Sequence, residues 1–124
     1  MQNSQSLNGK VALVTGSGRN IGRATALRLA SLGAAVAVNA RTNESEAKSV
    51  EKEITDNGGQ AVSVLGNVGS ESEVKSMFEK IEKTLGNVTI LVNNAGLRED
   101  KSTSQMTTDE WRRVLSVNLD GPFY

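Results

Sequence analysis

The sequence predicts an α/β fold in which a doubly wound, parallel sheet carries helices on both of its faces. Short apolar runs alternate with longer amphipathic segments, and glycines separate the two kinds of segment. Strand–helix–strand units of this kind connect in a right-handed sense and place helices on both sides of a parallel sheet. The 124 residues are enough for one domain with a buried core, and we expect residues 1–124 to form it.

Four apolar runs predict the strands, at residues 10–15, 35–40, 60–65 and 88–92. The first run, KVALVT, is continuously apolar and ends at a glycine, which is typical of a strand buried on both faces. The last run is equally apolar, yet no further strand follows it in these 124 residues. We therefore expect an exposed hydrophobic edge and interpret the sequence as the amino-terminal half of a longer protein.

Amphipathic segments predict helices at residues 20–32, 43–57 and 70–85, and a further helix from Thr107. Three of these segments begin with the spacing of a capping box, an N-cap residue followed three positions later by an acid. The pairs are Asn43 and Glu46, Ser70 and Glu73, and Thr107 and Glu110. The third segment carries one apolar face for the core, made of Val74, Met77, Phe78, Ile81 and Leu85.

Composition excludes several classes of function. Fourteen basic residues balance fourteen acidic ones, so no net charge attracts nucleic acid or a membrane surface. The chain has no cysteine and no histidine, so we expect no disulfide, no thiolate chemistry and no metal site. Residues 1–8 lack the apolar core of a signal peptide, and no apolar run approaches the roughly 20 residues that span a bilayer. We expect a cytoplasmic protein.

A glycine-rich turn joins the first strand to the first helix, where residues 15–22 read TGSGRNIG. Such a turn brings the backbone close to a pyrophosphate, which the unpaired N–H groups of a helix start can bind. No Gly-Lys-Ser/Thr follows, which excludes a P-loop, and the strand-turn-helix context favours a nucleotide site over incidental turn glycines. The sequence thus predicts a Rossmann-type fold with these candidate cofactor-binding residues: Gly16, Ser17, Gly18, Arg19, Asn20, Ile21 and Gly22.

The same turn resembles the T-G-x-x-x-G-x-G pattern of the short-chain dehydrogenase/reductase family, with Asn20 in place of the middle glycine. Asparagine is the non-glycine residue that best tolerates a positive φ, so we expect the turn to persist. Residues 93–96, NNAG, and the helix ending in VNLDGPF extend the resemblance, which covers residues 7–124. It points towards members similar to 3-oxoacyl-acyl-carrier-protein reductases.

The resemblance implies roles for residues after the later strands. Asn67, in place of the family's acid, and Val68 would contact the adenine. The segment Asn94, Ala95 and Gly96 would line the cofactor cleft. Asn118 matches the family's catalytic asparagine, whereas its serine and Tyr-x-x-x-Lys pair have no match here, since the sole tyrosine is Tyr124. The resemblance also implies a homo-oligomer, dimer or tetramer, and an isolated 124-residue chain without turnover.

Two arginines indicate the cofactor. An acid at the end of the second strand would select NAD by binding the ribose 2′-OH, but that position reads Ala40-Arg41, with no acid before Glu44. Arg41 and Arg19 instead suit a 2′-phosphate, which accepts bidentate hydrogen bonds from guanidinium groups. We therefore expect NADP(H) and a carbonyl or alcohol substrate. The alternatives are a non-catalytic nucleotide-binding module and a Rossmann-like methyltransferase, the latter disfavoured because its cofactor requires an acid near Ala40.

Pro122 bears on the backbone around Asn118. A helical residue normally donates its N–H to the carbonyl four positions back, and proline has no N–H to donate. If the last helix continues through Pro122, the Asn118 carbonyl loses its usual partner and remains available to water. In the family, the matching carbonyl holds a water that passes protons towards the catalytic lysine. The alternative is a helix that ends near Asp120, with Gly121-Pro122 as an ordinary stop signal.

Overall fold

The computed structural model describes residues 6–124, so the first five residues of the polar start lie outside the described part. Four strands alternate with helices along the chain, which confirms the predicted fold class. The elements are β1 Val11–Val14, α1 Asn20–Ser31, β2 Ala35–Ala40, α2 Glu44–Asp56, β3 Ala61–Leu65, α3 Glu71–Thr84, β4 Ile90–Val92, α4 Thr108–Leu115, the π-helical segment η1 Ser116–Asp120 and α5 Gly121–Phe123. Across residues 6–124, no helix is long and apolar enough to cross a membrane.

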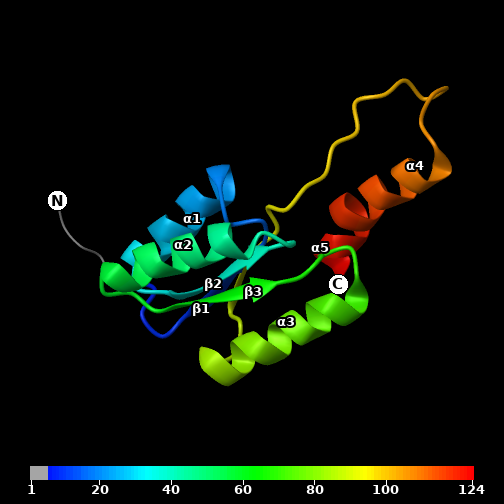
Figure 1. The fold of residues 1–124 in the computed structure, drawn as a ribbon. Coiled ribbons are helices and arrows are strands. Elements are labelled where there is room, and N and C mark those ends of the chain that lie inside the picture. Colours follow the sequence, from blue (N-terminus) through cyan, green and yellow to red (C-terminus); the bar gives the residue numbers. More distant parts are fainter. Residues whose placement is uncertain (1–5) are drawn as a thin grey trace.

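All four strands are parallel and lie in the order β3-β2-β1-β4 (Figure 1). In the register, Val11 lies opposite Ala35, and Val36 lies opposite Ala61. Every residue of β1 and β2 is buried, as expected for central strands of a sheet covered on both faces. The parallel arrangement brings the carboxyl ends of all four strands to the same edge of the sheet.

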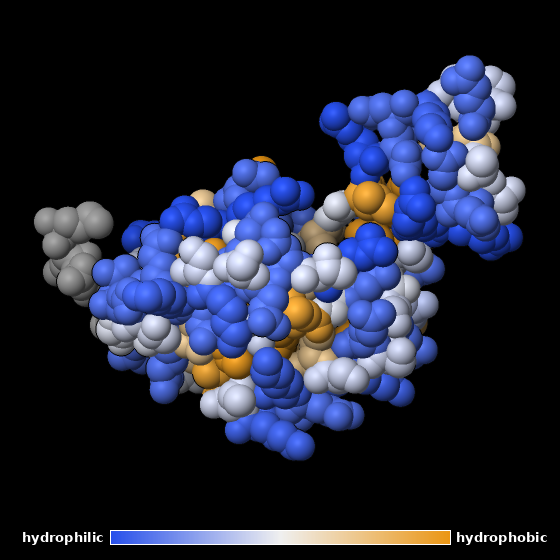
Figure 2. Space-filling view, viewed as in Figure 1, coloured by the Kyte–Doolittle hydropathy of each residue, from blue (hydrophilic) through white to orange (hydrophobic). Residues whose placement is uncertain are grey.

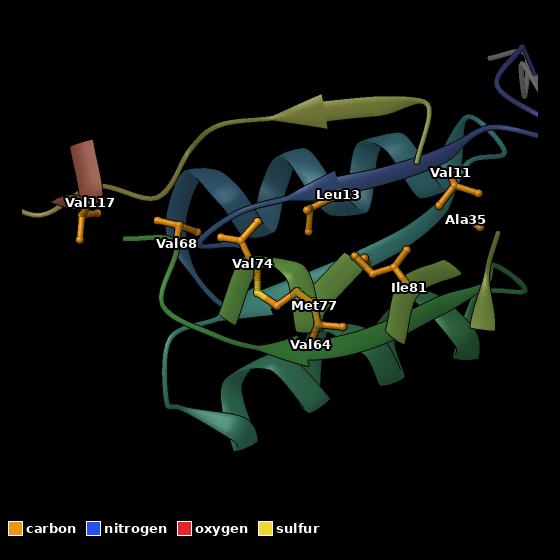
Figure 3. Packing of buried hydrophobic residues seen from close by; sticks show 10 residues of the cluster. Val11, Leu13, Ala35, Val64, Val68, Val74, Met77, Ile81 and Val117 are labelled. Atoms are coloured by element: carbon orange, nitrogen blue, oxygen red, sulfur yellow. The ribbon is translucent and has the colours of Figure 1, made fainter. Parts of the chain in front are cut away.

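Two hydrophobic clusters cover the two faces of the sheet. On one face, Leu13 and Val64 pack against Val74, Met77 and Ile81 of α3 (Figure 3). On the other face, α1 and α2 pack against β1 and β2 through a cluster that includes Ala26, Val50 and Ile54. Phe78 and Leu85 lie partly buried at the margin of the first cluster, so α3 presents the apolar face that its sequence predicts.

The fourth strand is shorter than the predicted run of residues 88–92. The amide of Thr89 donates to the carbonyl of Val11 at 2.9 Å, while its hydroxyl accepts from the amide of Val11 at 3.1 Å, so backbone and side chain together join the two strands just before β4. β4 forms one edge of the sheet, and Leu91 is 48% exposed. The expected apolar edge is therefore present, although only three residues long.

The last helix continues through Pro122. Its α-helical part α4 passes directly into η1 and then into α5, so the chain does not leave the helix at Asp120. The N–H of Gly121 donates to the carbonyl of Ser116, five residues back, as in a π-helix. Together with the loop that precedes it, α4 projects away from the sheet as a separate lobe (Figures 1 and 2). Trp111 on α4 is 56% exposed.

Candidate nucleotide-binding site

A cleft of about 540 Å³ opens at the edge of the sheet where the four strands end. Its walls come from the segments that follow each strand, together with the first turn of α2 and one residue of η1. The lining residues are 16 and 18–22 after β1, 39–43 with Glu46 at β2 and α2, 66–68 after β3, 94–97 after β4, and Val117. This is where ligands bind in open α/β sheets.

The glycine-rich turn has the backbone geometry expected from its sequence. Gly16 has a φ of 61°, and Asn20 has a φ of 52°, the only positive φ of a non-glycine residue among the described residues. Asn20 thus adopts the left-handed conformation that the middle glycine of the family pattern would otherwise supply. Gly22 packs so closely that a Cβ atom there would lie 2.2 Å from the carbonyl oxygen of Gly16.

Hydrogen bonds join the segment after β4 to this turn. The hydroxyl of Thr15 accepts from the amides of Asn94 and Ala95, each at 3.0 Å. The Asn94 side chain donates to the carbonyls of Thr15 and Gly16, also at 3.0 Å each. Asn94, Ala95 and Gly96 all line the cleft, so the structure places this segment beside the glycine-rich turn.

Ser17 differs from its neighbours because it does not line the cleft. Its side chain is fully buried, and its hydroxyl donates to the carbonyl of Val14 at 2.6 Å. The same hydroxyl accepts from the amide of Asn39 at 2.9 Å, and the amide of Ser17 donates to the carbonyl of Asn39 at 2.8 Å. Ser17 therefore supports the turn from behind, whereas the sequence pattern had suggested direct contact with a cofactor.

Arg19 and Arg41 both line the cleft and are exposed. No salt bridge within residues 6–124 engages either guanidinium. Both positive charges are therefore available to an anion in the cleft.

Glu46 is a cleft residue that the sequence analysis missed as a site residue. It belongs to the first turn of α2, where the side chain of the N-cap Asn43 accepts from its amide at 3.1 Å. Its carboxylate accepts from the side-chain N–H of Asn43 at 2.9 Å, and its other oxygen lies 3.4 Å from where a Cβ of Gly18 would be. The capping pattern signalled Glu46 only as a helix-start residue, and its position at the cleft depends on how α2 packs against the turn.

Asn67 and Val68 line the opposite part of the cleft, after β3. The side-chain oxygen of Asn67 accepts from the backbone amide of Gly69 at 2.9 Å, and the backbone N–H of Asn67 donates to the carboxylate of Glu73 at 3.0 Å. Glu73 therefore fixes the loop ahead of α3, while Ser70 serves as the N-cap. These bonds hold the Asn67 side chain in a defined position at the cleft wall.

Asn118 lies in η1, and its side chain is bound to the loop after β4. Its oxygen accepts from the amide of Leu97 at 2.9 Å, and its nitrogen donates to the carbonyl of Leu97 at 2.8 Å. This two-point contact places η1 next to Gly96, whose Cβ would lie 3.6 Å from the Asn118 oxygen. Pro122, four residues after Asn118, has no N–H to offer the Asn118 carbonyl.

Ion pairs attach the loop of residues 97–106 to α4. Glu99 pairs with Arg113, and Lys101 pairs with Glu110. Glu110 also completes the predicted capping box with Thr107. The hydrogen bond from Lys101, followed by those from Thr107, lowers the pKa of Glu110 to about 2. The loop that follows Leu97 is thereby held against α4.

Comparison with known proteins places this geometry in a family. Residues 10–124 match the short chain dehydrogenase family. The chain is 40% identical over 117 residues to a 3-oxoacyl-[acyl-carrier-protein] reductase of Synechocystis sp., with 94% of this chain and 47% of that protein covered. It is 41% identical over 114 residues to the reductase FabG of Staphylococcus epidermidis, with 92% and 47% covered. The chain spans about half the length of these curated relatives.

Solved structures give the same result. The landomycin C-6 ketoreductase LanV with bound NADP and rabelomycin superposes with a TM-score of 0.88 at 37% identity, covering 98% of this chain and 52% of that one. A gluconate 5-dehydrogenase from Burkholderia cenocepacia in complex with NADP and tartrate superposes with a TM-score of 0.85 at 36% sequence identity. The match covers 98% of this chain and 47% of that one. The matched family, the curated relatives and the shared fold agree, and the chain belongs to the short-chain dehydrogenase/reductase family.

Proposed function

We propose that this chain is the nucleotide-binding part of an oxidoreductase that transfers hydride between NADP(H) and a carbonyl or alcohol substrate. The observation that carries the proposal is the pair Arg19 and Arg41, which line the cleft without a protein partner among the described residues. A ribose 2′-phosphate is the group of NADP(H) that such guanidinium groups bind best. Relatives solved with NADP bound support the choice.

The residues of the cleft fit the other parts of this cofactor. The first turn of α1 leaves the amides of Asn20, Ile21 and Gly22 without intrahelical partners, because the first bond of the helix runs from Arg23 to Arg19. These N–H groups and the helix dipole suit a pyrophosphate, and Gly22 allows it close access. Asn67 and Val68 would contact the adenine. When bound, the nicotinamide supplies the hydride donor or acceptor.

Asn118 would contribute to proton transfer rather than to cofactor binding. Both the oxygen and the nitrogen of its side chain are hydrogen-bonded to Leu97, so the group of Asn118 that could bind a water is its backbone carbonyl. The proline four residues later leaves this carbonyl available to a water molecule, and π-helical segments often occur at functional sites. By the family resemblance, a serine and a Tyr-x-x-x-Lys pair complete the reaction, and they lie outside these 124 residues.

The proposal is tested on the full-length protein that carries this chain. NADPH should bind more tightly than NADH, and Arg41→Ala should weaken NADPH binding roughly tenfold or more while leaving NADH unchanged, since charge-assisted hydrogen bonds contribute about 1.5–3 kcal/mol. Ala40→Asp should narrow or reverse the preference. Arg28→Ala, an exposed arginine in the last turn of α1, is the matched control and should change neither constant.

Equal dissociation constants for NADPH and NADH in the unmodified protein would refute the cofactor assignment. Turnover is measured as NADPH oxidation with carbonyl substrates, beginning with a 3-oxoacyl thioester. The full-length protein should oxidise NADPH, and residues 1–124 produced alone should not. Tight NADPH binding without turnover by the full-length protein would instead indicate a nucleotide-binding module without catalytic activity.

A further inference from the structure

Asn39 is a polar residue buried at the centre of the site, with 2% of its surface exposed. It is the fifth residue of β2, whose other members are apolar. Its side-chain oxygen accepts from the amide of Gly16 at 2.9 Å. Its side-chain nitrogen faces the carbonyls of Ala40, Val64 and Gly66 at 3.1–3.3 Å and the sulfur of Met77 at 3.2 Å.

These partners define which way the amide group points. One end faces a donor, and the other faces only acceptors, so a reversed amide would place oxygen against three carbonyl oxygens. A carboxylate would create the same repulsion, and an aliphatic side chain would leave the partly buried Gly16 amide without this partner. Only a neutral group with both an acceptor and a donor satisfies this position.

Asn39 also determines which amides of the glycine-rich turn face the cleft. Its side chain takes the N–H of Gly16, and its backbone carbonyl takes the N–H of Ser17 at 2.8 Å. The amides of Gly16 and Ser17 are therefore directed into the protein. The amides of Asn20, Ile21 and Gly22 at the start of α1 have no intrahelical partner and are left for an anion in the cleft.

We propose that Asn39 is a positioning residue for the pyrophosphate of the cofactor: its carboxamide anchors the glycine-rich turn to the end of β3 and thereby orients the amides of α1. This rests on the proposed function, because it assumes that the cleft binds NADP(H). Asn39 has no hydrogen bond to Arg19 or Arg41, and it acts on the phosphate-binding turn through Gly16 and Ser17.

The first test compares two ligands in the full-length protein. NADP⁺ contains the pyrophosphate, whereas adenosine 2′-phosphate contains only the part that Arg41, Arg19 and the adenine wall would bind. Asn39→Ala should weaken NADP⁺ binding about tenfold, the order of one misplaced set of hydrogen bonds. It should weaken adenosine 2′-phosphate binding by no more than about threefold, because Arg19 lies in the turn but Arg41 does not. Asn87→Asp, at an exposed position in the turn before β4, is the control and should leave both unchanged.

The second test uses Asn39→Asp, which mimics the amide only when it is protonated. Burial and the facing carbonyls raise the pKa of this carboxyl above its unfolded value of about 3.9. The folded state then holds its proton more strongly, so stability is present at low pH and is lost as pH rises through the folded pKa. The titratable groups that line the cleft together with Asn39 are Arg19, Arg41 and Glu46, and Glu73 binds the backbone of Asn67 at the same cleft. All four are unchanged in the Asn87→Asp control.

We expect the melting temperature of Asn39→Asp, relative to that of the control, to decrease as the pH is raised from 5 to 8. We also expect its NADP⁺ binding to recover at pH 5. Equal weakening of both ligands in Asn39→Ala would overturn the proposal, because it would indicate general damage to the cleft. An Asn39→Asp variant whose melting temperature follows that of the control at every pH would overturn the proposal as well. If the unmodified protein binds neither ligand, the proposed function fails, while the melting temperatures still report whether Asn39 fixes the turn.

Discussion

Gly22 offers a sharp test of how closely α1 must approach the sheet. In Gly22→Ala, the new Cβ would lie 2.2 Å from the carbonyl oxygen of Gly16, 2.6 Å from the side-chain nitrogen of Asn94 and 2.8 Å from the Cα of Ser17. Two of these atoms belong to the backbone of the turn, so they cannot rotate away. The start of α1 must therefore move, and the hydrogen bonds from Asn94 to Thr15 and Gly16 are strained.

Two effects of opposite sign determine the result. Alanine is favoured over glycine inside a helix by about 1 kcal/mol. Overpacking costs typically 1–3 kcal/mol, and each weakened hydrogen bond from Asn94 costs about 1 kcal/mol more. The steric term dominates, and we expect a net loss of about 2–4 kcal/mol in the free energy of unfolding.

Urea denaturation of the full-length protein measures this loss as a lower midpoint at an unchanged slope. Gly96→Ala is the matched control, because its Cβ would meet only the Asn118 oxygen at 3.6 Å, an ordinary contact. We expect the control to change the free energy by less than about 1 kcal/mol. A Gly22→Ala variant as stable as the parent would refute the reasoning.

Two further predictions concern Glu51 of α2, which binds the edge strand β3, and Pro122 in the last helix. Burial alone raises the pKa of Glu51, but hydrogen bonds from Ser63 and the charge of Lys48 outweigh it and lower the pKa. This carboxylate therefore stabilises the fold above its unfolded pKa and ceases to do so as pH falls through the folded pKa. Glu51→Gln should cost about 1–2 kcal/mol at pH 7 and progressively less below pH 4.5, as followed by urea denaturation; a constant difference would contradict this. Pro122→Ala restores an N–H four residues after Asn118, so kcat of the full-length protein should fall while NADPH affinity stays the same. An unchanged kcat would count against a water at the Asn118 carbonyl.

Local patterns were sufficient to predict most elements. The residues Asn43, Ser70 and Thr107 cap their helices as their spacing indicates, because a cap depends only on residues three positions apart. Asn20 adopts the predicted positive φ for a similar reason, since the turn itself requires it. β4 is shorter than the predicted run, and the hydroxyl of Thr89 takes the amide of Val11, 78 positions away in the chain. The apolar pattern of the run does not indicate that side-chain contact.

The positions of Ser17 and Asn39 depend on contacts between segments that are distant in the sequence. Ser17 belongs to the glycine-rich turn by sequence, yet its three hydrogen bonds direct it into the protein. Asn39 reads as a polar interruption of an apolar strand, yet its side chain binds segments 23–38 positions away. A polar residue inside a run buried on both faces was the available signal, because such a group must find partners.

The charges at the end of β2 are not the only ones that bear on the choice of cofactor, because Glu46 in the first turn of α2 also lines the cleft. Acids are favoured in the first turn of a helix by the dipole and by N-capping, and α2 begins directly at the cleft. The capping contact with Asn43 then fixes this carboxylate beside Gly18. Its contacts in the structure are those of a helix start, and it lies in α2 and not at the end of β2. The cleft consequently holds one carboxylate against two arginines, and the excess of positive charge remains on the side that favours a 2′-phosphate.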